Sequence, residues 1–369
     1  MKIKMYAAVA ALVLLPAPAA ATGWPQSGYG PGNTFYNPDE SRLNSATIAG
    51  VRQRWTLTSP YSYGCQAGTD PIVSDGRLFT ADKGGFGAYD PATGTRRWHV
   101  ALPDTTIGRL AAVDGRLLVL TSVCQVPAPY ESRLSAYDPA TGRLLWSAGL
   151  RKFTFDMRVD RGVVALNSNQ NGVASTVAYR AADGRPLWLL KGDRGDGLVS
   201  AGGRLLLRTA AGGAKAVAIT TGKTLWQTKQ NRYAVGTDPD GGVFYLDGAG
   251  LTAVDAATGK VRWATTTHVA EVTTDRRHVF YGHDRSIVCL DAATGRKLYS
   301  VHTPGPAGRA VRAGGLLYVG SGTRSPMTIA DAATGAVRAA GMPSNQNHAP
   351  VIADGRIFVT EGDALRAYY

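Results

Sequence analysis

One six-residue motif occurs twice in full in the sequence, as Tyr89-Asp90-Pro91-Ala92-Thr93-Gly94 and as Tyr137-Asp138-Pro139-Ala140-Thr141-Gly142. Shorter variants follow and end at Gly184, Gly222, Gly259, Gly295 and Gly335. Successive glycines of the seven copies lie 48, 42, 38, 37, 36 and 40 residues apart. A nearly fixed period of this size indicates a chain of repeated supersecondary units.

Each unit contains four strand-like runs. In the first unit they are residues 71–74, 77–80, 87–89 and 97–100, and Asp75-Gly76 is a hairpin dipeptide between the first two. In the repeated phrase, the aspartate side chain can accept local backbone N–H groups, and the glycine can adopt a positive φ. No stretch shows helical periodicity with caps at both ends. The sequence therefore predicts an all-β protein of four-stranded antiparallel units.

An aromatic residue follows six of the turns, four residues past the glycine: Trp98, Trp146, Trp188, Trp226, Trp263 and Tyr299. Four-stranded units repeated radially are the blades of a β-propeller. On the outermost strand of a blade, such a large side chain can pack over its own blade and wedge against the next one. We predict this structural role for all six.

The two ends of the sequence complement each other. Residues 350–356 repeat the opening of the first unit, and Tyr369 falls where Asp90 would be, so the last unit has three strands. Residues 52–56 resemble residues 95–99, which form the fourth strand of a unit. Pairing this early strand with the last three would close the ring and cover an exposed edge. The expected fold is an eight-bladed propeller.

The first residues resemble a secretory signal peptide, with a short basic start, an apolar run over 7–15 and alanines at 19–21. We expect a signal peptide over residues 1–21, an N-terminal segment over 22–50 and a single propeller domain over 51–369. No apolar stretch is long enough for a transmembrane anchor. The protein is expected to be exported and either secreted or associated with the cell envelope.

The net charge of +13 raises the question of an anionic partner. The excess of basic residues is divided between both faces of the expected propeller, and aspartates are interleaved at most turns. This distribution argues against a nucleic-acid partner, which requires a basic stripe or patch. A binder of anionic cell-wall polymer stays open as one alternative.

The combined phrase, Asp-Gly-Arg-Leu followed by a strand, Tyr-Asp-x-x-Thr-Gly and a tryptophan, resembles the repeat of the PQQ-type (quinoprotein-like) β-propellers. Trp24-Pro25-Gln26 is also similar to the segment that precedes the first blade in that family. The resemblance runs from Trp24 to Tyr369. It implies the propeller fold, but the superfamily contains both quinone-dependent alcohol dehydrogenases and non-catalytic scaffolds.

The sequence departs from the enzymes of that superfamily. They carry adjacent cysteines, whereas Cys65, Cys124 and Cys289 are separated here. They also hold Ca²⁺ with clustered oxygen ligands, and no comparable cluster of Asp and Glu is evident. The chain is closer in character to the BamB-like propellers, which implies protein binding through loops. A PQQ-dependent dehydrogenase of alcohols or sugars, with PQQ and Ca²⁺, stays open as the other alternative; otherwise no cofactor, metal or catalytic residue is predicted.

The cysteines have two expected roles. Cys65 precedes the first strand of blade 1, and Cys124 begins the loop between the second and third strands of blade 2, on the same face. Neighbouring blades can bring these two within the distance of a disulfide, and export favours oxidation. The pattern is thus compatible with a Cys65–Cys124 disulfide. Cys289 is expected to be a buried thiol within a strand.

The loops on that same face vary most in composition and length. They are rich in amides and tyrosines, which make adaptable hydrogen bonds and flat contacts. We predict that the protein is a monomeric binding or scaffolding module whose partner is another exported or cell-envelope protein. The candidate binding residues are Tyr63, Gln66, Gln125, Tyr130, Asn169 and Asn345.

Overall fold

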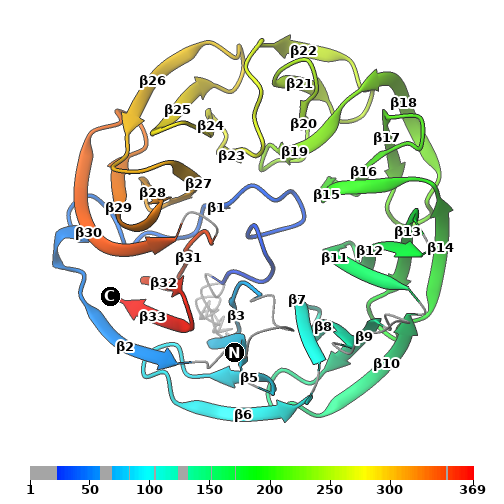
Figure 1. Cartoon of the computed structure of the whole chain (residues 1–369), viewed down its shortest axis with the longest axis horizontal. Coiled ribbons are helices and arrows are strands. Elements are labelled where there is room, and N and C mark those ends of the chain that lie inside the picture. Colours follow the sequence, from blue (N-terminus) through cyan, green and yellow to red (C-terminus); the bar gives the residue numbers. More distant parts are fainter. Residues whose placement is uncertain are drawn as a thin grey trace, which may run out of the picture.

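The computed structural model of the protein describes residues 23–58, 69–82, 84–103, 105–123, 132–150, 152–170, 172–345 and 348–369. Its strands form eight sheets around one axis, which confirms the predicted eight-bladed, all-β propeller (Figure 1). The expected signal peptide, residues 1–21, lies outside the described residues. In the part of the chain that is described, no helix has the length and apolar character needed to span a membrane.

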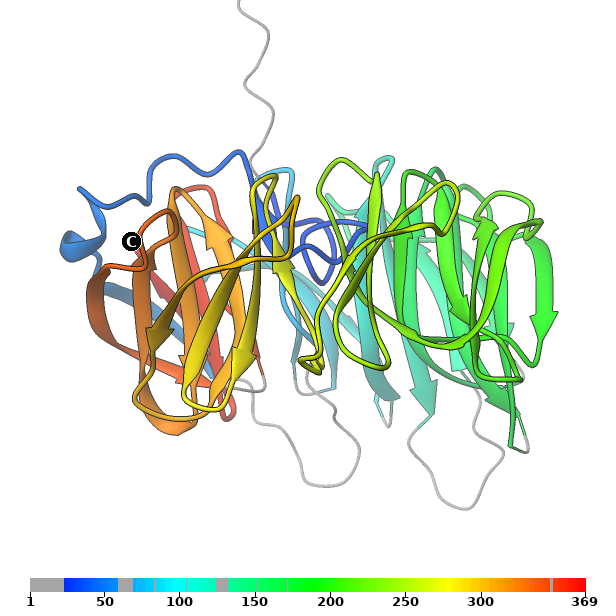
Figure 2. The same cartoon turned by 90° about the horizontal axis from the view of Figure 1, so that it is seen from above.

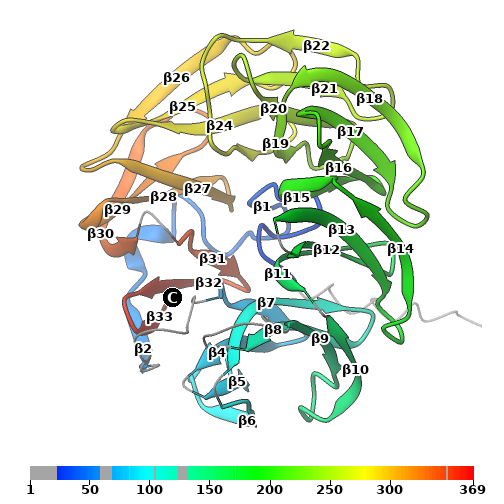
Figure 3. The same cartoon turned by 45° about the vertical axis from the view of Figure 1, so that its right-hand side comes forward.

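Each blade runs from an innermost strand at the axis to an outermost strand at the rim (Figure 3). Blade 1 contains β3 (Ile72–Ser74), β4 (Arg77–Asp82), β5 (Gly85–Tyr89) and β6 (Arg96–Ala101). Blade 2 contains β7 (Thr105–Val113), β8 (Arg116–Val123), β9 (Ser132–Tyr137) and β10 (Leu144–Leu150). Blade 3 contains β11 (Phe153–Asp160), β12 (Val163–Gln170), β13 (Val173–Arg180) and β14 (Pro186–Lys191). Blade 4 contains β15 (Arg194–Ala201), β16 (Arg204–Arg208), β17 (Gly213–Ala218) and β18 (Thr224–Asn231).

The remaining blades follow the same order. Blade 5 contains β19 (Tyr233–Thr237), β20 (Val243–Asp247), β21 (Thr252–Asp255) and β22 (Val261–Ala264). Blade 6 contains β23 (Thr273–Thr274), β24 (His278–His283), β25 (Ser286–Asp291) and β26 (Lys297–His302). Blade 7 contains β27 (Ala307–Ala313), β28 (Leu316–Ser321), β29 (Thr323–Asp331) and β30 (Val337–Asn345). Blade 8 combines β31 (Val351–Ala353), β32 (Arg356–Glu361) and β33 (Ala364–Tyr368) with β2 (Gln53–Thr58).

Blade 8 closes the ring as predicted. Its outermost strand, β2, precedes blade 1 in the sequence and pairs antiparallel with β33, for example Trp55 with Ala367. The early strand therefore covers an edge that β33 would otherwise expose.

The hairpin turns between the first and second and between the third and fourth strands share one side of the ring, here called the turn face. The connections into the first strand and between the second and third strands share the opposite side, the loop face. In Figure 2 the turn face is uppermost and the loop face is lowermost.

The repeated turn has the geometry that the sequence indicated. The Asp90 carboxylate accepts the backbone N–H groups of Ala92 at 2.8 Å and Thr93 at 3.2 Å. Gly94 has a φ of +71°. The hydrogen bond from Ala92, followed by those from Arg97 and Thr93, holds the pKa of Asp90 below its usual range although partial burial opposes it.

An aromatic residue of the outermost strand binds the next blade at every junction except that of blades 7 and 8. The Trp98 indole lies over Gly142 and donates Nε1–H to the carbonyl of Pro139 at 3.2 Å. Trp55, Trp146, Trp188, Trp226 and Trp263 repeat this contact on successive turns, and the Tyr299 hydroxyl donates to Ala332 in the equivalent place. The predicted wedge role of the aromatic residues is confirmed.

The apolar core lies between blades. One cluster joins Phe79 and Phe86 of blade 1 to Leu117 and Val119 of blade 2, all with no exposed surface. Fully burying side chains of this kind contributes about 1.5–3 kcal/mol each. Cys289 is also buried with no exposed surface, as expected for a strand thiol, and burial raises its pKa to about 12.

The junction between blades 7 and 8 lacks the aromatic contact. Ala339 occupies the position four residues after Gly335, where the other outermost strands carry Trp or Tyr. A short 3-10 helix, η1 (Ile48–Gly50), covers this junction, and Ile48 is only 2% exposed. Ile48, Ala339 and Met342 pack in one apolar cluster. Residues before blade 1 therefore replace the missing aromatic side chain.

Residues 24–37, here called the axial strap, cross the axis on the turn face and contact the innermost strand of all eight blades in order (Figure 1). From blade 1 to blade 8 the hydrogen-bonded pairs are Trp24 with Val73, Pro25 with Ala112, Gln26 with Val159, Pro31 with Ser200, Gly32 with Thr237, Thr34 with Thr274, Phe35 with Arg312, and Asn37 with Ile352. The strap also contributes β1 (Tyr36–Asn37), which pairs in parallel with β27.

A buried arginine fixes the middle of the strap. Arg158 is 5% exposed and donates to the carbonyls of Ser27 at 2.7 Å and Gly30 at 3.1 Å. Its Nε–H donates to Leu198 of blade 4 at 2.8 Å. One guanidinium thus satisfies backbone carbonyls on the strap and on a neighbouring blade, as a buried charge requires.

The contact between the turn glycine and the aromatic ring predicts a difference between two glycines. Gly115 and Gly142 both have positive φ, but a Cβ at 115 meets nothing within 4 Å, whereas one at 142 lies 2.8 Å from the Trp98 ring. Gly115→Ala is expected to cost about 1–2 kcal/mol through backbone strain. Gly142→Ala should cost a further 1–3 kcal/mol, roughly, because the ring must move. Urea unfolding measures both, and equal losses would contradict a tight inter-blade contact.

Candidate functional site

The predicted binding residues were expected on the loop face, and two of the six lie in the described part of the chain. Four lie outside the described residues: Tyr63, Gln66, Gln125 and Tyr130. The two cysteines considered for a disulfide, Cys65 and Cys124, also lie outside them. The backbone of Asn345 ends β30, and Asn169 lies near the loop-face end of β12. Asn169 is therefore the predicted residue whose neighbours the structure defines.

An exposed aromatic pair lies beside Asn169. Phe153 is the direct register partner of Asn169 across the β11–β12 pair. Phe153 and Phe155 are 41% and 43% exposed, and their rings stack with centroids 6.0 Å apart at an interplanar angle of 29°. Val173, which begins β13 on the same face, is 57% exposed. Blade 3 thus exposes three apolar side chains toward the loop face.

The aromatic pair was not predicted from the sequence. An alternating Phe-Thr-Phe run is normally buried through its phenylalanines. Here Thr154 is the buried residue, at 3% exposure, and its backbone N–H donates to the Ser132 hydroxyl of blade 2 at 2.9 Å. A register shift between Thr154 and Asp156 coincides with this exchange of buried and exposed positions. The sequence feature that could have indicated the exposed pair is the polar residue between two aromatic residues at the start of an innermost strand.

A cavity of about 400 Å³ opens at the loop-face end of blade 2, and Ser132 in its wall accepts the N–H of Thr154. All four strands of blade 2 and the loop before them contribute to its wall: Leu102, Thr105, Thr121, Val123, Ser132, Arg133, Gly149 and Leu150. Leu150 and Val123 are apolar, whereas Arg133 and the hydroxyl residues are polar. The wall can therefore accept an apolar side chain and hydrogen-bond a backbone next to it.

On the loop-face side of the strap, three ion pairs surround the axis. The pairs join neighbouring blades: Asp70 with His348 at 3.3 Å, Asp156 with Arg109 at 3.5 Å, and Glu271 with Arg309 at 2.8 Å. The Arg309 guanidinium also lies 4.2 Å from the Phe35 ring centroid of the strap. Each acid therefore faces a base, and the group connects six of the eight blades.

The Asp70–His348 pair is the titratable part of this group. The hydrogen bond and charge of Asp70 raise the pKa of His348, although burial opposes the shift. Burial alone would raise the pKa of Asp70, but the hydrogen bond and charge of His348 outweigh it and lower the value. The two shifts describe an imidazolium paired with a carboxylate.

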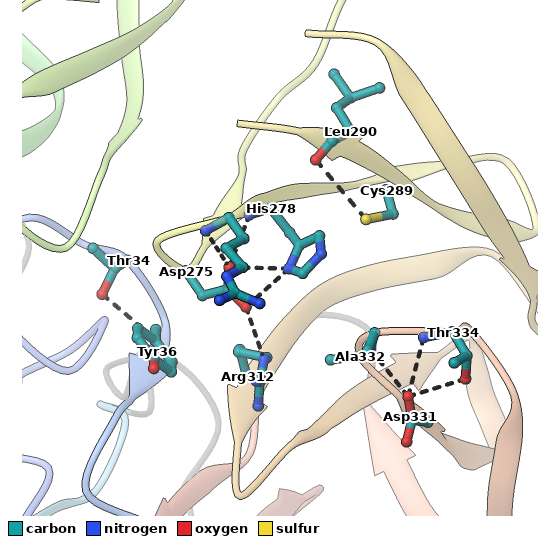
Figure 4. A network of polar contacts seen from close by, with 12 residues as sticks. Thr34, Tyr36, Asp275, His278, Cys289, Leu290, Arg312, Asp331, Ala332 and Thr334 are labelled. Atoms are coloured by element: carbon teal, nitrogen blue, oxygen red, sulfur yellow. Dashed lines mark hydrogen bonds and ion pairs between the residues drawn. The ribbon is translucent and has the colours of Figure 1, made fainter. Parts of the chain in front are cut away.

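On the strap side of the axis, Asp275 joins blades 6 and 7. Figure 4 shows its carboxylate between His278, at 3.1 Å, and Arg312, at 3.0 Å. Burial tends to raise the pKa of Asp275, but these partners and the N–H of Arg277 lower it to about 2. Arg312 also lies 5.6 Å from the Tyr36 ring of the strap. This network braces the strap against the blades.

A second cavity, of about 380 Å³, opens on the turn face between the strap and blades 3 to 6. Its carboxylates have structural partners. Asp160 accepts hydrogen bonds from Ser200 at 2.6 Å and from the N–H of Gly203 at 3.0 Å, and Asp240 pairs with Arg276 at 3.1 Å. Their hydrogen bonds serve the fold, so the loop face is the stronger candidate site.

The axial residues do not fit the calcium-bound quinone of the dehydrogenases. Calcium requires six to eight oxygen ligands, usually including several carboxylates. The axial carboxylates come from different blades, and each is paired with a cationic side chain. Across the described stretches of chain, no group of three or more His, Cys, Asp or Glu side chains is placed to hold a metal ion.

These features define a β-propeller built from PQQ-type repeats. The chain belongs to the family described as outer membrane protein assembly factor BamB, whose model matches residues 40–148, 130–279, 214–307 and 283–368. A comparison with curated proteins finds no match.

Solved structures share the fold at low sequence identity. Quinohemoprotein alcohol dehydrogenase from Comamonas testosteroni has a TM-score of 0.71 and 14% identity, covering 95% of this chain and 81% of that one. BamB from Moraxella catarrhalis has a TM-score of 0.63 and 15% identity, covering 86% and 99%. The computationally designed Ika8 protein has a TM-score of 0.65 and 14% identity, covering 85% and 98%. An enzyme and a designed protein share this fold, so the fold alone does not assign a function.

The Asp70–His348 pair predicts a pH-dependent stability. Because the folded pKa of His348 is raised above its ordinary 6.5, the pair stabilises the fold fully below that value, and this stabilisation is lost as pH rises through the raised pKa. Melting temperatures of wild type and His348→Gln, measured from about pH 5.5 to about 8.5, should differ most at the acidic end and converge at the basic end. A constant difference across this range would contradict the ion pair.

Proposed function

We propose that this protein is an exported, non-catalytic propeller that binds a partner protein through the loop face of blades 2 and 3. The observation that carries the proposal is the exposed, stacked pair Phe153 and Phe155. Exposed aromatic residues are typical of protein-binding surfaces, where they supply large contact areas at low entropic cost. The blade 2 cavity, whose wall includes Ser132 in contact with Thr154, offers a pocket for a protruding side chain of the partner.

The axis supports a binding role rather than catalysis. Strap residues occupy the turn-face end, and the bases on the loop-face side are engaged by carboxylates. Catalytic acids and bases need an accessible reacting group with a matched pKa. The axial acids and bases are instead held in ion pairs, in which Asp156 and Arg309 are 13% and 17% exposed and their partners Arg109 and Glu271 are 39% and 40% exposed.

Site-specific photo-cross-linking tests the choice of face. Val173→p-benzoylphenylalanine places the cross-linker on the exposed loop-face surface, and Ala293→p-benzoylphenylalanine places it on an exposed turn of the opposite face. In cells of the source organism, the Val173 variant should give one discrete adduct with an exported protein, and the Ala293 variant none.

Mass spectrometry identifies the adduct, and the purified partner must reproduce it with the purified propeller. Because both variants expose the same reactive group, an adduct of equal yield from position 293 would reject the loop face as the binding surface. The absence of any adduct from position 173 would reject the proposal itself.

Titration with PQQ and Ca²⁺ tests the enzymatic alternative. The axial carboxylates are paired with bases, so we expect no shift of the quinone absorbance and no heat of binding by calorimetry. Calcium-dependent binding accompanied by a red-shifted quinone band would overturn the non-catalytic proposal.

A further inference from the structure

The turn-face cavity of about 380 Å³ lies between the axial strap and the hairpin turns of blades 3 to 6. Its volume falls within the range of about 300–1,000 Å³ that is typical of small-molecule sites. All of its lining residues belong to the described part of the chain, among them Tyr29, Tyr36, Asp238 and Asp240. The strap therefore crosses the axis without filling the space beside these blades.

Two tyrosines of the strap give the cavity aromatic walls. The Tyr29 ring packs edge-on against Trp24, with centroids 5.5 Å apart and an interplanar angle of 77°. Its hydroxyl donates to the Asp39 carboxylate at 2.9 Å. Tyr36 belongs to β1, and the Arg312 guanidinium lies 5.6 Å from its ring centroid. Both tyrosines are half-buried, so their rings are held in place while part of each surface stays accessible.

Hydrogen bonds from the blades fix the strap backbone along the cavity. The Pro31 carbonyl accepts the N–H of Ser200 at 2.8 Å. The neighbouring Gly30 carbonyl accepts from the buried Arg158 guanidinium at 3.1 Å. The wall is thus already ordered, and a ligand binds it without the entropic cost of ordering a loop.

Asp238 of blade 5 supplies a carboxylate to the cavity wall. It accepts the backbone N–H groups of Val243, at 2.6 Å, and of Gly242. Neither donor neutralises its charge, and Arg262 of the same blade is paired with Asp255 at 2.8 Å. Burial raises the pKa of Asp238, although the two N–H groups and the charge of Arg262 oppose the shift. Hydroxyl donors of a ligand would stabilise a carboxylate in this setting.

An ion pair supplies donors next to these acceptors. Asp240, on the same turn, binds the Arg276 side chain of blade 6, whose Nε lies 3.1 Å from both carboxylate oxygens. The Asp240 and Arg276 side chains are 58% and 63% exposed, so both keep hydrogen-bonding capacity for a ligand. The lining residues as a whole include three aspartates and two arginines. The cavity therefore offers acceptors and donors together, without a large excess of either charge.

We propose that the turn-face cavity binds an uncharged carbohydrate. The C–H face of a sugar ring packs against a tyrosine of the strap, and the hydroxyl groups bond to Asp238, Asp240 and Arg276. Each sugar hydroxyl can donate to a carboxylate and accept from a guanidinium, so one ligand satisfies both kinds of group. A cation would lie beside Arg276, and an anion beside the aspartates. This site is on the face opposite the proposed protein-binding surface and does not depend on it.

Calorimetric titration of the mature protein with defined probes tests this inference. The neutral probes are maltotriose, cellotriose and the trimer of N-acetylglucosamine, and the charged probes are spermidine and trigalacturonate. We expect at least one neutral trisaccharide to bind with a Kd of about 1 mM or tighter, and at least about tenfold more tightly than either charged probe. Because that ligand has no charge, its Kd should change less than about twofold as salt rises from about 50 to about 300 mM.

A cavity-filling variant locates the binding. A Cβ at Gly30 meets nothing within 4 Å and Gly30 does not have a positive φ, so Gly30→Leu occupies the cavity edge without backbone strain. Gly50→Leu makes the same change at a glycine with the same freedom outside the cavity. The Gly30 variant should bind the trisaccharide at least about tenfold more weakly, and the Gly50 variant should match wild type. Equal affinity of both variants would reject the cavity as the site.

A second variant removes one charge and leaves the turn intact. Asp238→Asn keeps an oxygen that can accept the Val243 N–H, but it weakens the hydrogen bond to a sugar hydroxyl. Asp114→Asn is the matched control, on an exposed turn of the same face outside the cavity. We expect the Asp238 variant to bind about fivefold more weakly and the Asp114 variant to match wild type. Unchanged affinity in the Asp238 variant would overturn the assignment of the ligand to this wall.

The probe series decides between ligand classes. Tighter binding of spermidine than of any trisaccharide would assign the cavity to cations and overturn the inference, as tighter binding of trigalacturonate would for anions. No binding of the three neutral probes would also overturn it. None of these results alters the Val173 cross-link on the loop face, so the proposed function stands or falls separately.

Discussion

The contact between an aromatic ring and a turn glycine determines how the blades assemble. Each ring of the type shown by Trp98 needs a flat backbone surface on the next blade, and Gly142 provides it because it has no Cβ. The turn aspartate, the positive φ and the aromatic residue therefore belong to one unit of structure repeated at most junctions, whereas the junction of blades 7 and 8 lacks the aromatic ring. The period of about 40 residues follows, since each unit must supply both the turn for one neighbour and the ring for the other.

The parts of the fold that repeat could be predicted because each copy has its own local signal. The strands of blade 1, the closing pair β2 and β33, and the inter-blade aromatics agree with the sequence analysis. The strap could not be predicted in detail, because its partners are backbone groups of eight distant strands. The aromatic pair escaped prediction for a related reason: the register shift at Thr154 inverts the usual burial of an alternating run.

The candidate site was predicted at the level of a face rather than of residues. Asn169 lies within the surface described here, but loop composition alone did not distinguish one blade from another. Counting residues by face averages over all the blades, whereas a partner contacts two or three neighbouring blades. Only the strand register brings Phe153 beside Asn169 at the loop-face end of blade 3.

The strap has a consequence for the order in which the protein folds. Its first contact, Trp24 with Val73, spans a short part of the sequence, but Asn37 reaches Ile352 across 315 residues. Contacts of such separation form late, because closing a long loop costs entropy before it gains energy. Early blades can form while the strap is still unattached at its far end. The strap can therefore bind all eight blades only in a late step, after the whole ring has formed. A partly synthesised chain lacks the last blade and cannot complete this step.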